Sequence, residues 1–440
     1  MTSESTHPHP GLSASFGGRA GIRAIGLLVR RSLRQHALST AVTVFSVALA
    51  CGLVMAIFVI RAQAEAAFAG GACGFDAVLG PRGSRLQIVL NAIYHLESSP
   101  GNIPWSTYEN VSDIAGVKLA IPYAVGDNYL GARIVGTIPE ALTEVEYRPG
   151  RKPEVETGGR LFDPTRREAV VGAEAARRTG LTYGAKFHPS HGVEAGPDSH
   201  AHEETYVVVG VLQPTNTPMD RVIYIPLEGI LRMSGHVLRH EGDMYAAQPG
   251  EEVPDEFRQV SAILLKFAGP QVGLDLDERF NKQGTEATLA WPVGAVMTEM
   301  FDKLGWMVRI LTVVAYLVVV VAASAILAGV HNTINERRRD FAILRALGAR
   351  RATVFSVIAA EAGTIALCGA AAGFAVYAVV LFVAATVIRD QTGVVIDATA
   401  WHAALDWTPL GMLGLGVLAG LIPAVKAYST DVAGNLAPQA

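Results

Sequence analysis

The histidines of one short polar tract are the side chains of this sequence best suited to chemistry. The tract "HPSHGVEAGPDSHAHEE" holds His188, His191, His200 and His202 among acidic residues. Zinc and copper in proteins take imidazole ligands with carboxylate support, and short His-rich tracts are typical of metal binding. Zn or Cu is therefore a candidate cofactor at this tract. The alternative interpretation is a polar insertion between two strands, because the tract has no cysteine and its Gly and Pro residues fix no ligand geometry.

A carboxylate inside an apolar run is the second candidate. Glu361 is the charged side chain of the run Thr353–Ile388. An ionisable group within a membrane span is a functional-site candidate by default, because burying its charge in hydrocarbon is costly. The alternative is that Glu361 lies near the membrane surface, where it reaches water or the arginines at the start of the run. The cost of burial favours this second interpretation.

Motifs of catalysis are absent from the sequence. No G-x-x-x-x-G-K-[ST] phosphate loop occurs, and the glycine-rich "LGPRGSR" (Leu79–Arg85) lacks the lysine. No G-x-S-x-G or H-E-x-x-H pattern occurs either. The net charge of −4 comes with no basic domain, so nothing indicates nucleic-acid binding. We therefore expect a chain that is not an enzyme and holds no nucleotide cofactor of its own.

The composition is that of a membrane protein. The chain has 440 residues, of which 50% are hydrophobic, and its mean hydropathy is +0.31, which is high for a soluble protein of this size. A bilayer core of about 30 Å needs about 20 helical residues. Four apolar runs meet this length, and we predict membrane spans at residues 38–60, 306–330, 353–388 and 408–428. The "CGAAAGF" stretch of the third run lets helices approach closely.

The arginines predict which side of the membrane each segment occupies. They cluster before the first span and between the second and third, whereas Arg389 stands alone between the third and fourth. The positive-inside rule then predicts a multi-pass protein with both termini in the cytoplasm, and we expect the membrane to be the bacterial cytoplasmic (inner) membrane. The cytoplasmic segments are an amphipathic N-terminal segment (1–37), a loop (331–352) and a tail (429–440), and the outer segments are 61–305 and 389–407.

The large outer segment reads as a mixed α/β domain. β-branched runs bounded by Pro, Gly or Asn predict strands at Tyr206–Leu212, Arg221–Leu227 and Val260–Ala268. Arg167–Gly180 reads as the end of a strand followed by a short helix that stops at glycine. The residues that leave the first span and enter the second have helical character. We expect them to extend those spans beyond the membrane as helical stalks.

The cytoplasmic loop contains an amphipathic helix, "INERRRDFAILRALGARR" (Ile334–Arg351). Its apolar positions Phe341, Leu344 and Gly348 share one helical face, and arginines cover much of the rest. Such a helix can lie at the membrane surface or dock in a groove of a soluble partner. The alternative is a loop whose positive charge only sets topology.

This region resembles the FtsX-type and MacB-type permeases, which include the lipoprotein-releasing (LolC/LolE-like) permeases. The resemblance lies in a Glu-Arg-Arg start at Glu336, the core "ILRALGA", Glu361, and then Gly369 and Gly373. The closing "PAVKAYSTDVAGNL" (residues 423–436) is also similar, with Val432 where the family has proline. The resemblance is specific at residues 336–373 and 423–436 and weaker in the outer domain.

The resemblance implies the membrane (permease) subunit of an ABC transporter: four transmembrane α-helices with a large extracytoplasmic mixed α/β domain between the first two. It implies a separate ABC ATPase subunit that binds ATP and Mg, a second permease copy as a homodimer, and contact with membrane lipid; a periplasmic partner is a further candidate. The coupling element toward the ATPase would consist of Glu336, Arg337, Arg338, Phe341, Ile343, Leu344, Arg345, Leu347 and Gly348.

Two functions remain open at this point. A permease would export or extract a substrate, driven by ATP hydrolysis in the separate subunit. Some FtsX-type proteins instead act as transmembrane signal transducers that activate an extracytoplasmic partner without transport. The permease is the favoured interpretation.

Overall fold

The computed structural model comprises two compact units. The helical unit is formed by the described residues within Met1–Val59, Arg309–Phe382 and Thr399–Ala440, and the α/β domain by those within Ile60–Val308 and Val383–Ala398. The structure describes residues 19–69, 73–192, 201–233, 237–240, 243–246, 253–346, 349–392 and 400–428.

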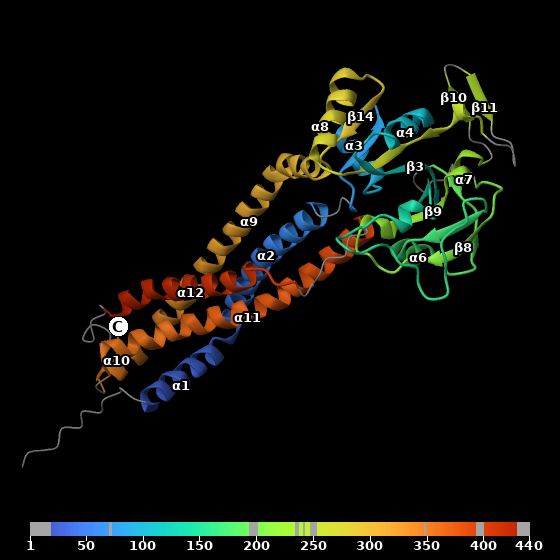
Figure 1. Ribbon diagram of the computed structural model, residues 1–440. Helices are drawn as coiled ribbons and strands as arrows, with labels where there is room; N and C mark the ends of the chain where they lie inside the picture. The colour runs from blue at the N-terminus through green and yellow to red at the C-terminus, as the bar shows by residue number, and fades with distance from the viewer. Residues whose placement is uncertain are drawn as a thin grey trace, which may run out of the picture. The chain divides into compact units, whose positions relative to one another are not determined.

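Long helices build the helical unit (Figure 1): α1 (Arg19–Gln35), α2 (Ala37–Ala69), α9 (Val293–Glu336), α10 (Arg338–Ala346), α11 (Arg351–Thr392) and α12 (Ala404–Tyr428). Within the described residues, four helices are long and apolar enough to cross a membrane, at Ala37–Ala66, Gly305–Glu336, Arg351–Asp390 and Ala404–Ile422. This agrees with the expectation of four apolar helices of membrane-spanning length. Helices α2 and α9 continue well beyond the apolar runs, because the flanking residues are rich in Ala, Glu and Met and contain no proline.

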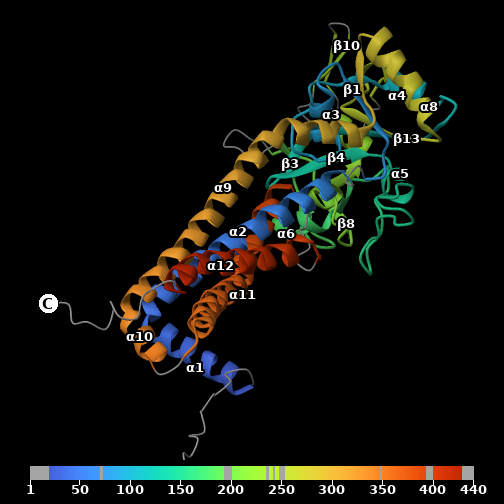
Figure 2. The ribbon, with the colours of Figure 1, turned by 90° about the vertical axis from the view of Figure 1, so that its left-hand side faces the viewer.

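Small residues let the helices of this unit pack closely. A Cβ added at Gly373 of α11 would lie 2.8 Å from the Cβ of Cys51 in α2, and one added at Gly420 of α12 would lie 2.3 Å from the Cβ of Ala362 in α11. Small residues at such positions are how membrane helices approach one another. Helix α2 is the most enclosed, with 56% of its most apolar window buried against 17% in the other three spans, and Figure 2 shows it between α9 and α11.

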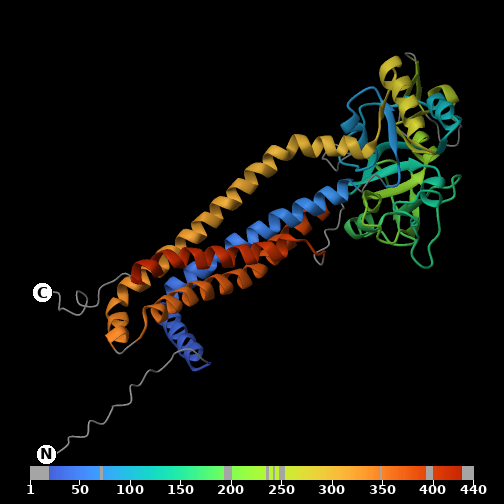
Figure 3. The same cartoon turned by 60° about the vertical axis from the view of Figure 1, so that its left-hand side comes forward.

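A mixed sheet forms the centre of the α/β domain (Figure 3). Among the described residues it has ten strands, in the order β14–β1–β13–β3–β4–β9–β5–β8–β6, with β7 paired to β3. The pairs β4–β9 and β5–β8 are parallel and the others antiparallel. The strands are β1 (Ala77–Pro81), β3 (Val117–Tyr129), β4 (Ala132–Thr137), β5 (Glu168–Val171), β6 (Lys186–Phe187), β7 (Ser190–His191), β8 (Tyr206–Val211), β9 (Val222–Pro226), β13 (Ala262–Phe267) and β14 (Ala287–Ala290).

Short helices and two ribbons complete the domain. The ribbons pair β10 (Val237–His240) with β11 (Asp243–Ala246) and β12 (Gln259–Val260) with β2 (Ile103–Pro104). The helices are α3 (Arg85–Ala92), α4 (Trp105–Ser112), α5 (Glu140–Thr143), α6 (Ala173–Thr179), α7 (Leu227–Leu231) and α8 (Pro270–Asp277), with 3-10 turns η1 (Pro218–Arg221) and η2 (Asp255–Phe257) and a π-helical segment η3 (Glu278–Gln283).

Apolar residues on both faces of the sheet explain why its strands read as continuous hydrophobic runs. In β9, Ile223 and Ile225 pack on one face with α4, α6, α7 and α8, whereas Val222 and Tyr224 pack on the other with α3 and α5. Successive side chains of a strand point to opposite faces, and a sheet covered on both faces requires both sets to be apolar. The expected mixed α/β domain between the first two spans is thus confirmed.

The chain enters and leaves this domain through neighbouring strands. Strand β1 follows α2 and strand β14 precedes α9, and the two pair antiparallel with Val78 opposite Ala290. The backbone N–H of Val293, the first residue of α9, donates to the carbonyl oxygen of Asp76 at 3.1 Å. The start of α9 is therefore hydrogen-bonded to the segment that leads into β1.

Candidate functional site

The first candidate site is a polar cluster where helices of the helical unit meet end to end. We call it the junction cluster: Ser32, His36, Glu336, Arg337 and Glu361. Ser32 in α1 donates a hydrogen bond to Oε1 of Glu361 in α11 at 2.8 Å. His36 joins α1 to α2 and lies with Nδ1 3.0 Å from Oε2 of Glu336, where α9 ends. The cluster therefore ties the α1–α2 junction to the α9–α10 junction and to α11.

Charge balance explains why Glu361 is tolerated in an apolar helix. Its side chain is 5% exposed, and a buried carboxylate needs hydrogen bonds and an opposite charge to offset the loss of water. Ser32 supplies the hydrogen bond, and the side chains of Arg337 and His36 act on the carboxylate electrostatically. The sequence indicated Glu361 but not Ser32, which is 329 positions away in the chain.

The described apolar residues of helix α10 differ in their exposure. Phe341 is 7% exposed, and the guanidinium carbon of Arg337 lies 5.2 Å from the centre of its ring, so Phe341 packs inside the chain. Ile343 is 44% exposed, because two residues along an α-helix turn by about 200°. Leu344 and Arg345 are half-buried. Arg338 begins α10, and Leu347 and Gly348 lie outside the described residues.

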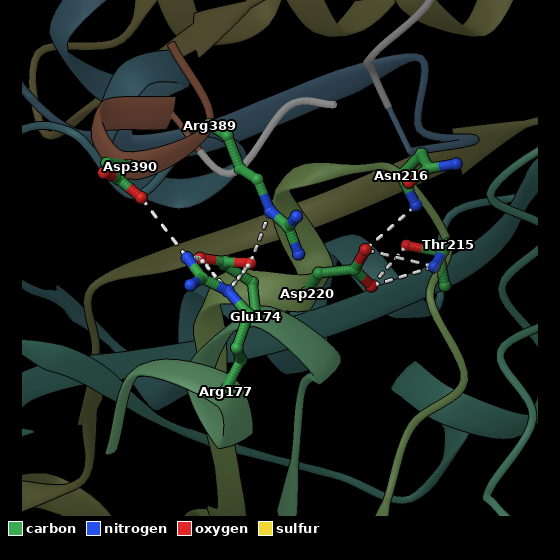
Figure 4. Close-up of polar contacts among 7 residues, drawn as sticks. All are labelled: Glu174, Arg177, Thr215, Asn216, Asp220, Arg389 and Asp390. Carbon is green, nitrogen blue, oxygen red and sulfur yellow. Dashed lines mark hydrogen bonds and ion pairs between the residues drawn. The ribbon is translucent and has the colours of Figure 1, made fainter. Parts of the chain in front are cut away.

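The second candidate site lies at the end of α11 that belongs to the α/β domain (Figure 4). We call it the α6–α11 cluster: Glu174, Arg177, Arg389 and Asp390. Nε of Arg389 lies 3.0 Å from Oε2 of Glu174, and Nε of Arg177 lies 3.0 Å from the same oxygen. Arg177 also reaches Oδ1 of Asp390 at 3.2 Å. Two carboxylates and two guanidinium groups thus join α6 to α11.

Glu174 is the centre of this cluster and carries a perturbed charge. Its side chain is 3% exposed, and burial alone raises the pKa of a carboxyl group. The hydrogen bonds from Arg177 and Arg389 outweigh that effect and hold the pKa of Glu174 below its ordinary value. Glu174 is therefore ionised at neutral pH and remains an acceptor for both arginines.

A rigid turn fixes the start of α6 and so positions Glu174. A Cβ added at Gly172, the residue before α6, would lie 2.5 Å from the carbonyl oxygen of Asp220. The Asp220 carboxylate accepts hydrogen bonds from the backbone N–H of Thr215 at 3.0 Å and of Asn216 at 2.9 Å, as Figure 4 shows. Burial raises the pKa of Asp220 although these hydrogen bonds oppose the shift.

The structure brings two of the four tract histidines together. His191 lies in β7, His202 is buried beyond the bridge of Ser190 with Ala201, and both reach Asp127 of β3. His188 is exposed and stands apart from this group, and His200 lies outside the described residues. Sequence reasoning missed Asp127, because it lies far from the tract and in an ordinary strand.

Apolar helices of membrane-spanning length, with an α/β domain inserted between the first two, define a multi-pass membrane protein with a large extramembrane domain. Comparison with known families agrees. Residues 40–263 match the MacB-like periplasmic core domain, and residues 312–432 match the C-terminal region of FtsX-like permeases. The chain therefore belongs to the FtsX-like permease family with a MacB-like periplasmic core domain, which confirms the resemblance seen at residues 336–373.

The individual relatives share little sequence identity with this chain. The chain is 24% identical over 289 residues to an uncharacterized ABC transporter permease of Methanocaldococcus jannaschii, and the match spans 65% of this chain and 66% of the relative, just under two thirds. The periplasmic region of MacB from Actinobacillus actinomycetemcomitans matches with a TM-score of 0.31 and 11% identity, over 52% of this chain and 94% of that one. The extracellular domain of the noncanonic ABC-type transporter YknZ from Gram-positive bacteria matches with a TM-score of 0.27 and 15% identity, over 48% and 97%.

Proposed function

We propose that this chain is the permease subunit of an ABC transporter, which converts ATP hydrolysis in a separate ATPase subunit into movement of the α/β domain. Family membership and the similarity to an uncharacterized ABC transporter permease of Methanocaldococcus jannaschii support this proposal. The observation that carries it is the helix α9. It is continuous over 44 residues from β14 to the edge of α10, about 66 Å at 1.5 Å per residue. Such a helix is long enough to cross a bilayer core of about 30 Å and extend well beyond it.

Helix α10 is the proposed docking element toward the ATPase. The chain itself buries Phe341, so the apolar anchor offered to a partner is Ile343, with Leu344 beside it and the guanidinium groups of Arg339 and Arg345 at the rim. An apolar side chain surrounded by charge is the usual composition of an interface centre and its rim. ATP and Mg²⁺ bind in the partner subunit.

The junction cluster and the α6–α11 cluster are the proposed transmission points. Movement of α10 displaces Glu336 and Arg337. The contact between His36 and Glu336 transmits this movement to α1 and α2. Helix α11 carries Glu361 near one end and Arg389 near the other, where Arg389 holds Glu174 of α6. Substrate is handled at the α/β domain or in the outer leaflet, since the apolar runs of the sequence carry almost no charge besides Glu361.

Topology and assembly complete the proposal. The arginines of α1 and of residues 337–351 support, by the positive-inside rule, an orientation with these segments and both termini on the cytoplasmic side of a bacterial inner membrane. Large apolar side chains are exposed along α9, α11 and α12, which suits contact with lipid and with a second permease copy. The chain works as a homodimer with two ATPase subunits.

The substitution Ile343→Asp tests the docking element. A charge at the centre of an apolar interface lowers affinity strongly, so we expect at least a tenfold loss of the ATPase subunit recovered with the affinity-purified permease, and a matching loss of ATPase activity in the complex. The control is Leu130→Asp, which places the same charge on an exposed leucine of the α/β domain.

Two outcomes contradict the proposal. If Ile343→Asp recovers as much ATPase subunit and ATPase activity as the wild-type chain, α10 is not the docking element. If no ATPase subunit copurifies with the wild-type chain from its native host, the permease function itself is wrong.

A further inference from the structure

Three side chains that could ligate a metal converge on the α/β domain. Nε2 of His202 lies 3.1 Å from Oδ1 of Asp127, and Nδ1 of His191 lies 3.5 Å from the same oxygen. The three ligand atoms all lie within 4.8 Å of one another. The two imidazole rings meet edge to face, with centroids 5.8 Å apart. We call these residues the His–Asp cluster.

Backbone pairing holds the cluster in place. Strand β7 pairs with β3 so that His191 stands opposite Asp127, and the N–H of Gly192 donates to the carbonyl oxygen of Gly126 at 2.9 Å. The N–H of His202 donates to the carbonyl oxygen of Pro189 at 2.8 Å. The two histidines thus stand on segments fixed by the sheet, and their approach to Asp127 is a property of the fold.

Burial and charge favour a cation at this position. Asp127 is fully buried, and a carboxylate without water requires an opposite charge or several donors. His202 is buried beside it, whereas the side chain of His191 is 62% exposed. The cluster is therefore accessible to solvent on the side of His191.

We propose that Asp127, His191 and His202 bind a divalent transition-metal ion, with Zn²⁺ as the best match. Zinc bonds of about 2.0–2.1 Å in a tetrahedron place neighbouring ligand atoms about 3.3 Å apart, and the two distances to Asp127 fall on either side of this value. Two imidazoles and one carboxylate fill three positions, and a water or a solute ligand fills the fourth. This site is independent of the proposed permease function.

Zinc titration of the purified full-length chain in detergent tests the site. After treatment with a chelator, wild-type chain and variants compete with a chromophoric chelator for ZnCl₂. We expect His191→Ala to weaken zinc binding by more than about tenfold, since even residues that only support a metal ligand contribute about 10–100-fold. His191 is exposed, so its removal leaves the core intact. The control is His188→Ala, an exposed histidine of the same tract outside the cluster.

A variant of the buried ligand Asp127 and a spectroscopic measurement provide two further tests. Asp127→Asn keeps the shape of the side chain but removes its charge, and should weaken zinc binding while the chain still elutes as a folded species. Cobalt(II) bound to the wild-type chain should give the intense visible bands of a tetrahedral site, and His191→Ala should lose them. The proposal is overturned if wild type binds no zinc, if His191→Ala binds like wild type, or if His188→Ala weakens binding equally.

Discussion

The contact between Arg389 and Glu174 allows a quantitative test of how α11 is fastened to the α/β domain. The substitution Arg389→Gln removes a guanidinium whose Nε lies 3.0 Å from Oε2 of Glu174. Glu174 is 3% exposed, so the acceptor end of this bond is shielded from water. Arg177 remains paired with Glu174 in the variant, so no buried carboxylate is left without a cation.

The expected loss follows from these contacts. A hydrogen bond to a charged group contributes about 1.5–3 kcal/mol. The Arg389 side chain is 42% exposed, so solvent screening lowers the expected loss to the bottom of this range or just below it, about 1–1.5 kcal/mol. This corresponds to roughly a tenfold increase in the opening equilibrium. Glu174→Gln should cost more, because it weakens the contacts with both arginines.

Hydrogen exchange on the full-length chain in detergent measures this equilibrium. We expect amide protection in residues 383–392 and in α6 to fall about tenfold in Arg389→Gln. The control is Arg166→Gln, which breaks an exposed ion pair of 3.6 Å to Asp163 and should leave α6 unchanged. On the Glu174→Gln background, Arg389→Gln should have little further effect. Equal protection of α6 in Arg389→Gln and Arg166→Gln would refute the reasoning.

Two further predictions concern the buried carboxylates. The folded-state pKa of Glu174 lies below its ordinary value. The stability that ionised Glu174 contributes is therefore complete above the unfolded-state pKa and is lost as pH falls through the folded-state pKa. Amide protection of α6, corrected for the intrinsic exchange rate, should be constant from about pH 8 to 5 and fall below about pH 4. Loss of protection already near pH 6 would contradict this. Glu361→Ala removes the hydrogen-bond acceptor of Ser32 and the negative partner of Arg337, and should lower the free energy of unfolding by on the order of 3 kcal/mol, measured by thermal unfolding. Glu361→Gln keeps the hydrogen-bond acceptor and should lower it less. Wild-type stability of both variants would contradict the buried geometry.

Local features of the fold could be predicted from the sequence because they depend on local patterns. The run Arg221–Leu227 became β9, since its β-branched residues fit a strand buried on both faces. The helix expected to stop at Gly180 does so, and Gly180 takes the left-handed conformation that glycine favours at a helix end. The apolar runs predicted the spans for the same reason, because length and hydropathy alone decide which helices can cross a membrane.

Contacts between distant residues could not be predicted in this way. Ser32 with Glu361, Arg389 with Glu174 and Asp127 with His202 each join segments whose pairing depends on the whole topology. The orientation of α10 escaped prediction for a related reason. The periodicity of its sequence predicts which apolar residues share a face. Which of these residues is buried depends on the packing of Phe341 against Arg337.

The proposed function makes α11 a moving part, and its contacts differ along its length. Glu361 toward one end and Arg389 toward the other make directional contacts with neighbouring helices. Between them, Gly369 and Gly373 meet α2 through close apolar packing, which depends on distance but not on the alignment of donors and acceptors. A small rotation of α11 would therefore disturb the hydrogen bonds toward its ends before it separates the helices. Under the proposed function, the two polar clusters set the states of this helix, so substitutions there should alter the proposed coupling to ATP hydrolysis more than substitutions of equal size on the lipid-facing side.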